Sequence, residues 1–469
     1  MENLICSNVS QRQRRPVRPS CLTAPMRLSI VSSLLAIAFS LVGAPMLHAQ
    51  YPEYPRQIGE YQSLASKALP KWVKFDVELR SRVEYQSAMN LIPNEHDAYD
   101  LTRVRGGAQI RATHWASLYV QFQDAHALAL PAPNRAANMW DTFDLRQGYL
   151  DLHHRNVTFV AGRQELRYGD ERVIGVSDWT NIGRTWDGFL LRIGNQRSKN
   201  KLDLFTTSVV SVYPRSLDTH GAGLTFHGAV GTITTPLPKT TVQPFLFVRT
   251  APRVKSQQGI YGEEHRFTPG IIFMREQKSG LDYEITATLQ RGIYSNDAIR
   301  AGSAIVKVGY TSDSLPLNPH IGFEYDYATG NPRHNPNRMS TNDQLYPSNH
   351  NAFGLVDLFG FQNLEQLRGS LDLTPAKDLS VFLQTGSLRV ATAGDGIYNA
   401  AGTLLVNGPL PGRGIGTELD ASLKYLYTKS FIVDAGIGHF FPGQAIKQNG
   451  STTPFTIAYF GLTYRFRIE

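Results

Sequence analysis

Arginine residues recur at alternate positions in two short stretches of the sequence. Arg80 and Arg82 stand two apart in "ELRSRVE", and Arg103 and Arg105 stand two apart in "LTRVRGG". Side chains two residues apart point to the same face of an extended strand, so each pair presents two guanidinium groups side by side. A guanidinium fork binds carboxylates in bidentate fashion, which predicts a patch that attracts anionic groups.

Other charged residues extend this candidate site. Basic side chains concentrate on the first segments, whereas carboxylates dominate the segments that begin near residues 280, 318 and 415. Opposed walls of this kind would create a transverse field in a water-filled pore. The candidate pore-lining, solute-binding residues are Arg80, Arg82, Arg103, Arg105, Arg111, Arg146, Arg163, Arg184, Asp187, Arg192, Glu324, Asp326 and Arg368. The open alternative is that many of these charges only pair across strands, for the first arginines with Asp76, Glu78 and Glu84.

The sequence does not indicate catalytic or metal-binding motifs. It contains no HExxH and no GxSxG motif, and both cysteines, Cys6 and Cys21, precede the apolar run near the N-terminus. Asp170 or Glu171 could form a carboxylate pair with Asp187, but nearby arginines make salt bridges the preferred interpretation. We therefore expect no enzyme, no metal and no cofactor, with a barrel enzyme such as a phospholipase or protease kept as the second class of hypothesis.

The elements that position these residues are predicted by an alternation of residue types. In "KWVKFDVELRSRVEY" (71–85) apolar and aromatic residues occupy most of the odd positions and charged residues almost all of the even ones. This is the pattern of a strand with two unlike faces. About 18 such segments follow one another, starting near residues 72, 101, 115, 143, 156, 185, 201, 220, 242, 264, 280, 302, 318, 365, 379, 415, 430 and 455, and no helical period competes with them past residue 65.

The connections between these segments alternate in length. Short ones, such as 113–114 and 374–378, alternate with long ones, such as 165–184 and 329–364. Tight turns at one end and long loops at the other are typical of outer-membrane barrels. The connection 230–241 breaks the rule, because it should be a short turn and yet has about a dozen residues.

A closed barrel in lipid explains why one face of each strand is apolar and the other is charged. Lipid would cover the apolar outside, and the charged inside would line a water-filled lumen. We therefore predict an all-β, antiparallel transmembrane barrel of about 18 strands in the outer membrane of a Gram-negative cell. Outward positions are expected at Phe75, Val77, Val104, Ile110, Phe323, Leu423 and Leu462.

The N-terminal region has the features of a secretion signal. Arg27 precedes the apolar stretch 28–41, and "LHA" (47–49) ends in a small residue. We expect residues 1–49 to be a signal peptide with Met26 as the start of translation, residues 50–70 a short periplasmic segment and residues 71–469 the barrel. Removing 1–49 takes away five arginines and one glutamate, so the formal charge falls from +8 to +4, which gives no support to nucleic-acid binding.

Several long blocks of sequence resemble a known family. "DLRQGYLDL" (144–152), "GRQELRYGDERVIGVSDWTNIGRTWDG" (162–188), "FEYDYATGNP" (323–332) and "GTELDASLKYLYTKSFIVDAGIGHFFPGQAIK" (416–447) are similar to the alginate export family of outer-membrane porins. The resemblance implies an 18-stranded, monomeric barrel with an arginine-rich lumen that conducts an anionic polyuronate. It also implies a gating loop between the eighth and ninth strands, where this sequence has 230–241, a shorter segment than such a gate needs.

The function expected from these observations is a passive channel for hydrophilic solutes, with anionic sugars or polyuronates such as alginate as the solute. The alternative is a general or neutral-sugar porin. The expected partners are outer-membrane lipid and lipopolysaccharide, the saccharide solute and the barrel-assembly machinery.

Overall fold

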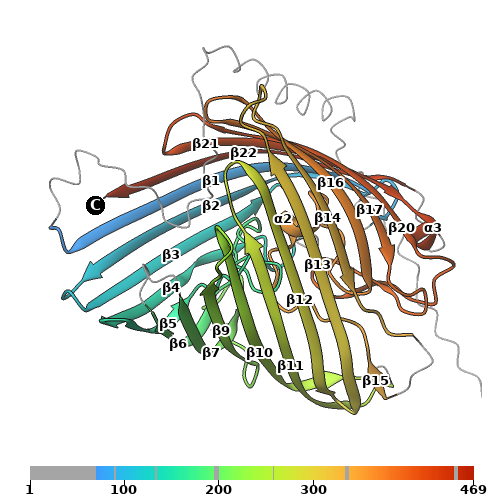
Figure 1. The fold of residues 1–469 in the computed structure, drawn as a ribbon, viewed down its shortest axis with the longest axis horizontal. Helices are drawn as coiled ribbons and strands as arrows, with labels where there is room; N and C mark the ends of the chain where they lie inside the picture. The colour runs from blue at the N-terminus through green and yellow to red at the C-terminus, as the bar shows by residue number, and fades with distance from the viewer. Residues whose placement is uncertain are drawn as a thin grey trace, which may run out of the picture. The chain divides into compact units, whose positions relative to one another are not determined.

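Eighteen long antiparallel strands form one closed sheet in the computed structural model, which confirms the predicted fold class and strand number (Figure 1). The structure describes residues 70–88, 91–131, 135–194, 200–256, 258–332, 337–447 and 453–468. The predicted signal peptide, and the predicted segment 50–70 apart from its last residue, lie outside these residues. The eighteen strands are β1 (Val73–Ser87), β2 (His96–Arg111), β3 (Ala116–Leu128), β4 (Asp141–His154), β5 (Val157–Gln164), β6 (Trp186–Ile193), β7 (Lys201–Ser211), β9 (Thr225–Thr234), β10 (Thr240–Lys255), β11 (Tyr261–Arg275), β12 (Gly280–Tyr294), β13 (Asp297–Thr311), β14 (His320–Ala328), β16 (Leu364–Ala376), β17 (Leu379–Val390), β20 (Gly414–Leu426), β21 (Phe431–Pro442) and β22 (Phe455–Ile468).

The first and last strands close the barrel. β1 pairs with β22 in antiparallel register from Phe75 opposite Ile468 to Ser87 opposite Thr456. Each of the other strands pairs with its neighbours along the chain in the same antiparallel manner. Closure leaves no sheet edge with unpaired backbone groups, which is the condition for strands to cross a bilayer.

The outer face of the barrel is apolar, as the alternation predicts. Val104 is 47% exposed and Phe323 is 65% exposed, although both are large apolar residues. Exposed aromatic residues gather toward both rims. Trp72, Trp115, Tyr310 and Tyr427 stand near the short turns, and Phe143, Tyr213 and Tyr261 stand near the long loops. Such girdles are typical of outer-membrane barrels at the two water interfaces.

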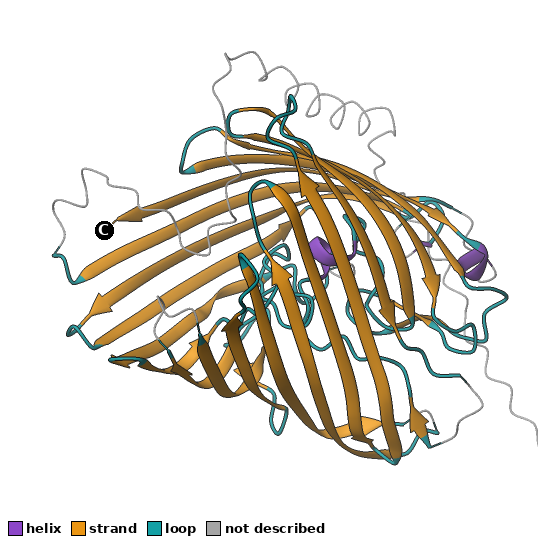
Figure 2. Cartoon of the chain, viewed as in Figure 1, coloured by secondary structure: helices purple, strands orange, loops and turns teal. Residues whose placement is uncertain are grey.

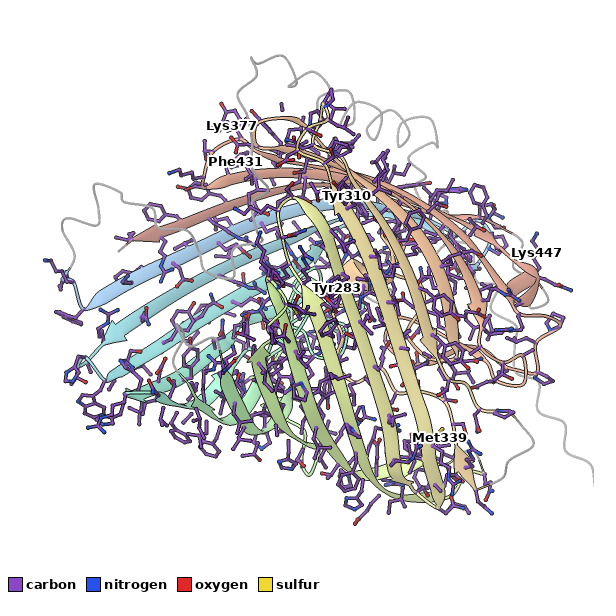
Figure 3. The ribbon with its side chains drawn as sticks, viewed as in Figure 1. Tyr283, Tyr310, Met339, Lys377, Phe431 and Lys447 are labelled. Atoms are coloured by element: carbon purple, nitrogen blue, oxygen red, sulfur yellow. The ribbon has the colours of Figure 1, made fainter. Side chains whose placement is uncertain are left out.

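The two ends of the barrel differ as the loop lengths predict. Lys377 and Phe431 mark the end with the short turns, and Met339 marks part of the end with the long loops (Figure 3). The connection between the eighth and ninth strands, β9 and β10, consists only of residues 235–239. The expectation of a dozen-residue connection there was wrong, because both flanking strands extend further than their alternation indicated. The turn is closed by hydrogen bonds from Thr235 N to Thr240 O (3.1 Å) and from Thr240 N to Leu237 O (3.3 Å).

Within the described parts of the connections there are four short strands and two short helices. They are β8 (Thr219–His220), β15 (Arg338–Met339), β18 (Ile397–Tyr398), β19 (Leu404–Val406), α2 (Asn349–Phe353) and α3 (Gln444–Lys447). None of the helices among the described residues is long and apolar enough to cross a membrane.

Two long connections fold into the barrel. The β5–β6 loop (165–185) and the described part of the β14–β16 loop (329–363), which includes α2, occupy its middle (Figure 2). Each packs an apolar core against inward-facing wall residues. Ile174 and Val176 of the first loop pack with Trp186, Phe226 and Phe247 of the wall. The loops therefore narrow a lumen that the strand count alone would leave wide.

Candidate pore constriction

The β5–β6 loop is held against the wall that β1 and β2 form. Arg80 donates to the carbonyl oxygens of Asp178 (2.9 Å) and Thr180 (2.9 Å). Arg82 donates to Trp179 O (2.7 Å). An irregular loop has no ladder to satisfy its backbone carbonyls, and the five donors of a guanidinium suit this task.

The second strand completes this arginine wall, which we define as Arg80, Arg82, Arg103 and Arg105. Arg105 donates to Ile182 O (2.9 Å), and Arg103 donates more weakly to Thr180 O (3.2 Å). Arg80 stands directly opposite Arg103 in the register of the two strands. The predicted patch of guanidinium groups therefore exists, and it faces five successive carbonyl groups, those of residues 178–182.

Carboxylates neutralise most of the arginine wall. Glu78 accepts from Arg103 Nε (2.9 Å), and Glu84 accepts from Arg82 Nε (2.6 Å). Asp178, at the tip of the loop, accepts from Arg105 Nη1 (2.7 Å). Burial alone would raise the pKa of Asp178, but the surrounding arginines, led by Arg103, hold this pKa well below its usual range. Asp178 is thus charged at all ordinary pH values.

The tips of the two inner loops meet at an aromatic stack. Trp179 of the β5–β6 loop lies parallel to His350 of the β14–β16 loop, with ring centroids 3.6 Å apart. The guanidinium carbon of Arg82 lies 3.6 Å from the centroid of the same tryptophan. Burial, assisted by the charge of Arg82, lowers the pKa of His350 well below its usual value, so the imidazole is neutral. A neutral ring can stack here without adding a second cation.

A short backbone ladder joins the two loops behind this stack. Gly175 N donates to Tyr346 O (2.8 Å), Tyr346 N donates to Val173 O (3.1 Å), and the loops form a parallel bridge at Ile174. Arg184 reinforces the junction by donating to Tyr346 O (2.7 Å). The two loops therefore act as one crossbar inside the barrel.

A second part of the barrel wall binds the crossbar with carboxylates. This carboxylate wall comprises Glu324 and Asp326 on β14 and Glu418 and Asp420 on β20. Arg172 of the β5–β6 loop contacts both Glu324 and Asp326, as does Arg368 of β16. The backbone of the β14–β16 loop is bound here too. Val356 N donates to Glu418 Oε1 (3.1 Å), and Leu355 N donates to Asp420 Oδ2 (3.2 Å).

Comparisons with known proteins agree with this architecture. The sequence model described as "Alginate export" matches residues 71–458. The chain belongs to the alginate export family. A comparison with curated protein sequences finds no significant match.

Solved porin structures share the fold of this family member. OpdK of Pseudomonas aeruginosa, crystallised with vanillate, is 12% identical, with a TM-score of 0.58 over 84% of this chain and 98% of that one. OccK8 (OprE) of Pseudomonas aeruginosa is 12% identical, with a TM-score of 0.58 over 85% and 98%. OccAB2 of Acinetobacter baumannii is 11% identical, with a TM-score of 0.58 over 84% and 98%. This likeness concerns the fold, and together with the family it places the protein in the outer membrane as a channel-type barrel.

Most of the predicted site residues of this alginate export family member come together at the crossbar. Arg146 of β4 forms an ion pair with Glu165, at the start of the β5–β6 loop (2.5 Å). The residues brought together are Arg80, Arg82, Arg103, Arg105, Arg146, Arg184, Glu324, Asp326 and Arg368. Their contacts are with the loops and with each other, which is close to the pairing alternative left open by the sequence.

Four predicted residues lie elsewhere. Arg111 is exposed at the end of β2, and Arg192 pairs with Asp203 (2.7 Å) near the short turns. Arg163 pairs with Asp187 (2.8 Å). These two share their face of β5 and β6 with the exposed Phe159 and Phe189 and stand opposite the buried Gln164 and Trp186. That face is the outer one, so the expectation that Arg163 and Asp187 line the pore was wrong. The phase of both short strands was ambiguous in the sequence.

Sequence reasoning missed the loop residues that meet the arginines. Asp178 and Trp179 lie in a block that carries the family resemblance, and His350 lies in another long loop, but loop residues have no periodicity that indicates where they point. The only available signal was chemical. An "SDW" tripeptide (177–179) in a long loop, opposite a row of arginines, could have suggested an inward-folded loop.

Proposed function

We propose that the protein is a passive outer-membrane channel for small hydrophilic solutes that prefers anionic sugars or uronate oligomers such as those of alginate. The observation that carries the preference for anions is the partnering of Arg80. The other arginines of the wall each have a carboxylate at ion-pair distance. Within the described residues, Arg80 instead donates to neutral acceptors, the third being Asn181 Oδ1 (3.1 Å).

Arg80 is also the member of the arginine wall that keeps appreciable exposure. Arg82, Arg103 and Arg105 are buried, whereas Arg80 is half-buried. Its Nε is buried and its two terminal nitrogens bind the loop, but its charge is not cancelled by a direct ion pair. A low-dielectric wall on one side strengthens the attraction of such a charge for a passing carboxylate.

A general or neutral-sugar porin is the alternative. It is favoured by the extent to which the wall charges already bind the loops, since a paired charge offers little to a solute. In either case the crossbar argues for small solutes or extended chains and against bulky ones. The fold and the family support a channel over a barrel enzyme.

The other proposed partners follow from the surface of the barrel. Outer-membrane lipid and lipopolysaccharide would cover the apolar belt, and the barrel-assembly machinery would insert the chain as a monomer. We propose no cofactor.

Planar-bilayer recordings of wild type and Arg80→Ala test the preference for anions. The wild type should show anion preference in a KCl gradient and block by uronate oligomers, with weaker block by neutral oligosaccharides. Arg80→Ala should shift the reversal potential toward cations and weaken block by uronates only. The difference should shrink at 1 M salt, where the Debye length is about 3 Å, compared with about 10 Å at 0.1 M.

Arg111→Ala is the matched control, because it removes an exposed arginine from a neighbouring strand far from the crossbar. A cation-preferring wild type, or equal shifts in the two variants, would contradict the proposal in favour of a general porin. Block by vanillate, the compound crystallised with OpdK, should be measured as well. Vanillate carries a carboxylate on an aromatic ring, so its effect distinguishes a preference for carboxylates from a preference for sugars.

A further inference from the structure

Three carboxylates gather at the end of the barrel that carries the long loops. Asp141 and Asp144 lie at the start of β4, and Asp218 lies in the connection between β7 and β9. One carboxylate oxygen of each lies within 4.8 Å of the others. Like charges at this distance repel one another strongly unless something positive stands between them.

Irregular pairing of β4 brings these residues together. The register against β3 shifts twice, between Gln121 and Phe122 and between Gln123 and Ala125. Such shifts re-aim side chains at the rims of barrels. The connection that carries Asp218 then folds back over β4, since Thr142 N donates to Pro214 O (3.3 Å) and Asp218 N donates to the carboxylate of Asp144.

The described arginine residues near the cluster form no ion pair with it, although Arg163 interacts electrostatically with Asp144 and Asp218. Asp141, Asp144 and Asp218 form no ion pair with any described residue. The nearest guanidinium groups are engaged elsewhere: Arg146 pairs with Glu165, and Arg163 pairs with Asp187 while it donates only to the backbone oxygen of Asp218.

Asp141 provides a second, independent observation that points to a bound cation. The residue is only 2% exposed, and its Oδ1 is buried with no hydrogen-bond partner. Leaving a buried carboxylate oxygen unsatisfied is costly, and native structures rarely do so without an ion or water. Asp144 is in contrast satisfied, since Leu145 N donates to its Oδ1 (2.5 Å).

A small cavity separates the carboxylates. Its volume is about 20 Å³, room for about one water-sized occupant, and Thr185 also lines it. The lining includes Gln123, whose side-chain oxygen accepts from Arg105, and Arg146, whose guanidinium group pairs with Glu165. We propose that this cavity binds one divalent cation, with Ca²⁺ as the best fit. Three carboxylates with the neutral Thr185 beside them, without His or Cys, match the preference of calcium for oxygen ligands in a flexible geometry.

A cation at this site would also stabilise the position of the β5–β6 loop. Ile182 and Gly183, from the end of the β5–β6 loop, line the same cavity. A bound cation therefore ties the connection between β7 and β9, the start of β4 and the root of this loop into one unit at the rim.

Metal titration of the full chain, refolded in detergent without lipopolysaccharide, tests the proposal. Lipopolysaccharide itself binds divalent cations and has to be absent. Tb³⁺ luminescence excited through Trp140, the neighbour of Asp141, should rise on titration and be reversed by Ca²⁺ at lower concentration than by Mg²⁺. Ca²⁺ should also raise the unfolding temperature, and a chelator should reverse the shift.

Asp141→Asn and Asp218→Asn should each weaken Ca²⁺ binding by about tenfold or more, since affinity follows the charge of the ligands. Asp124→Asn is the matched control, a nearby rim carboxylate that pairs with His126 (3.0 Å). No Tb³⁺ signal with wild type, or equal Ca²⁺ affinity in wild type and both variants, would overturn the proposal. If a variant fails to fold, the wild-type titration with its Mg²⁺ arm decides the question alone.

Discussion

The arginine wall and the carboxylate wall hold the same crossbar by opposite chemistry. On the arginine side, guanidinium groups donate to the backbone carbonyls of residues 178–182. On the carboxylate side at β20, Glu418 and Asp420 accept from the backbone amides of Val356 and Leu355. Irregular backbone inside a barrel needs partners for both kinds of group, and each wall supplies one kind.

The two walls differ in how their charges are balanced. Glu78 and Glu84 of β1 and Asp178 of the loop pair with three of the four arginines of the arginine wall. Glu418 and Asp420 have no cation at ion-pair distance among the described residues, and one oxygen of each is buried without a partner. The difference indicates that charge itself is needed on the arginine side, whereas on β20 the oxygen atoms matter more than their charge.

Breaking the arginine wall should have the largest effect. In Arg103→Ala with Arg105→Ala, Glu78 and Asp178 lose their buried partners, and the loop loses donors to its carbonyls. Removing one partner of a buried pair costs about 3–5 kcal/mol. We expect a lower free energy of unfolding, together with larger and noisier single-channel conductance as the crossbar loosens.

Arg111→Ala again serves as the matched control for that double variant, because Arg111 lies on the same strand outside the contact. Unchanged conductance in the double variant would show that these arginines do not hold the loop. If the double variant changed ion selectivity but kept its stability, Arg103 and Arg105 would instead have the solute-binding role that the sequence suggested.

The β20 carboxylates should tolerate loss of charge. Glu418→Gln with Asp420→Asn keeps an oxygen acceptor for each backbone amide while removing two like charges two residues apart. We expect the free energy of unfolding to stay within about 1 kcal/mol of wild type. Replacing both by alanine should cost about 1–3 kcal/mol, because the amides then lose their acceptors. Equal losses in the two double variants would indicate that the negative charge is needed after all.

The sequence predicted the barrel well because a strand in lipid has a strict period. Lipid covers one face continuously, so residues such as Phe75, Val104 and Phe323 mark the outside without reference to any partner. Closure, strand number and the two kinds of rim follow from that period. The prediction was ambiguous where the period is weak, as in β5 and β6, and this is where Arg163 and Asp187 were placed on the wrong face.

The constriction could be predicted only in part. Strand parity showed that Arg80, Arg82, Arg103 and Arg105 share a face, but it could not show what they meet. Their partners lie about a hundred residues away in a loop, for instance Arg80 with Asp178. Loop conformation depends on tertiary contacts of this kind, and a single sequence does not reveal them.

The smallest predicted effect concerns the pH dependence of the crossbar. Asp357 lies in the β14–β16 loop, is half-buried, and has one buried oxygen without a partner. Burial, with a contribution from Glu84 that Arg82 opposes, raises the pKa of Asp357 from 3.8 to about 7. Between these two values the docked loop holds a proton that a free loop would release. Docking is therefore strongest at low pH and weakens as the pH rises to about 7, above which the penalty stays constant.

Single-channel recordings between about pH 5 and pH 8 should show this weaker docking. Transient increases in conductance should become more frequent as the pH rises. Asp357→Asn should remove that component and keep the quieter, low-pH behaviour throughout, because the neutral amide mimics the protonated acid. Asp313→Asn, in the turn between β13 and β14 at the opposite end of the barrel, is the matched control and should behave as wild type. If Asp357→Asn kept the full pH response, the response would belong to another group. Docking of this loop would then be independent of pH near neutrality.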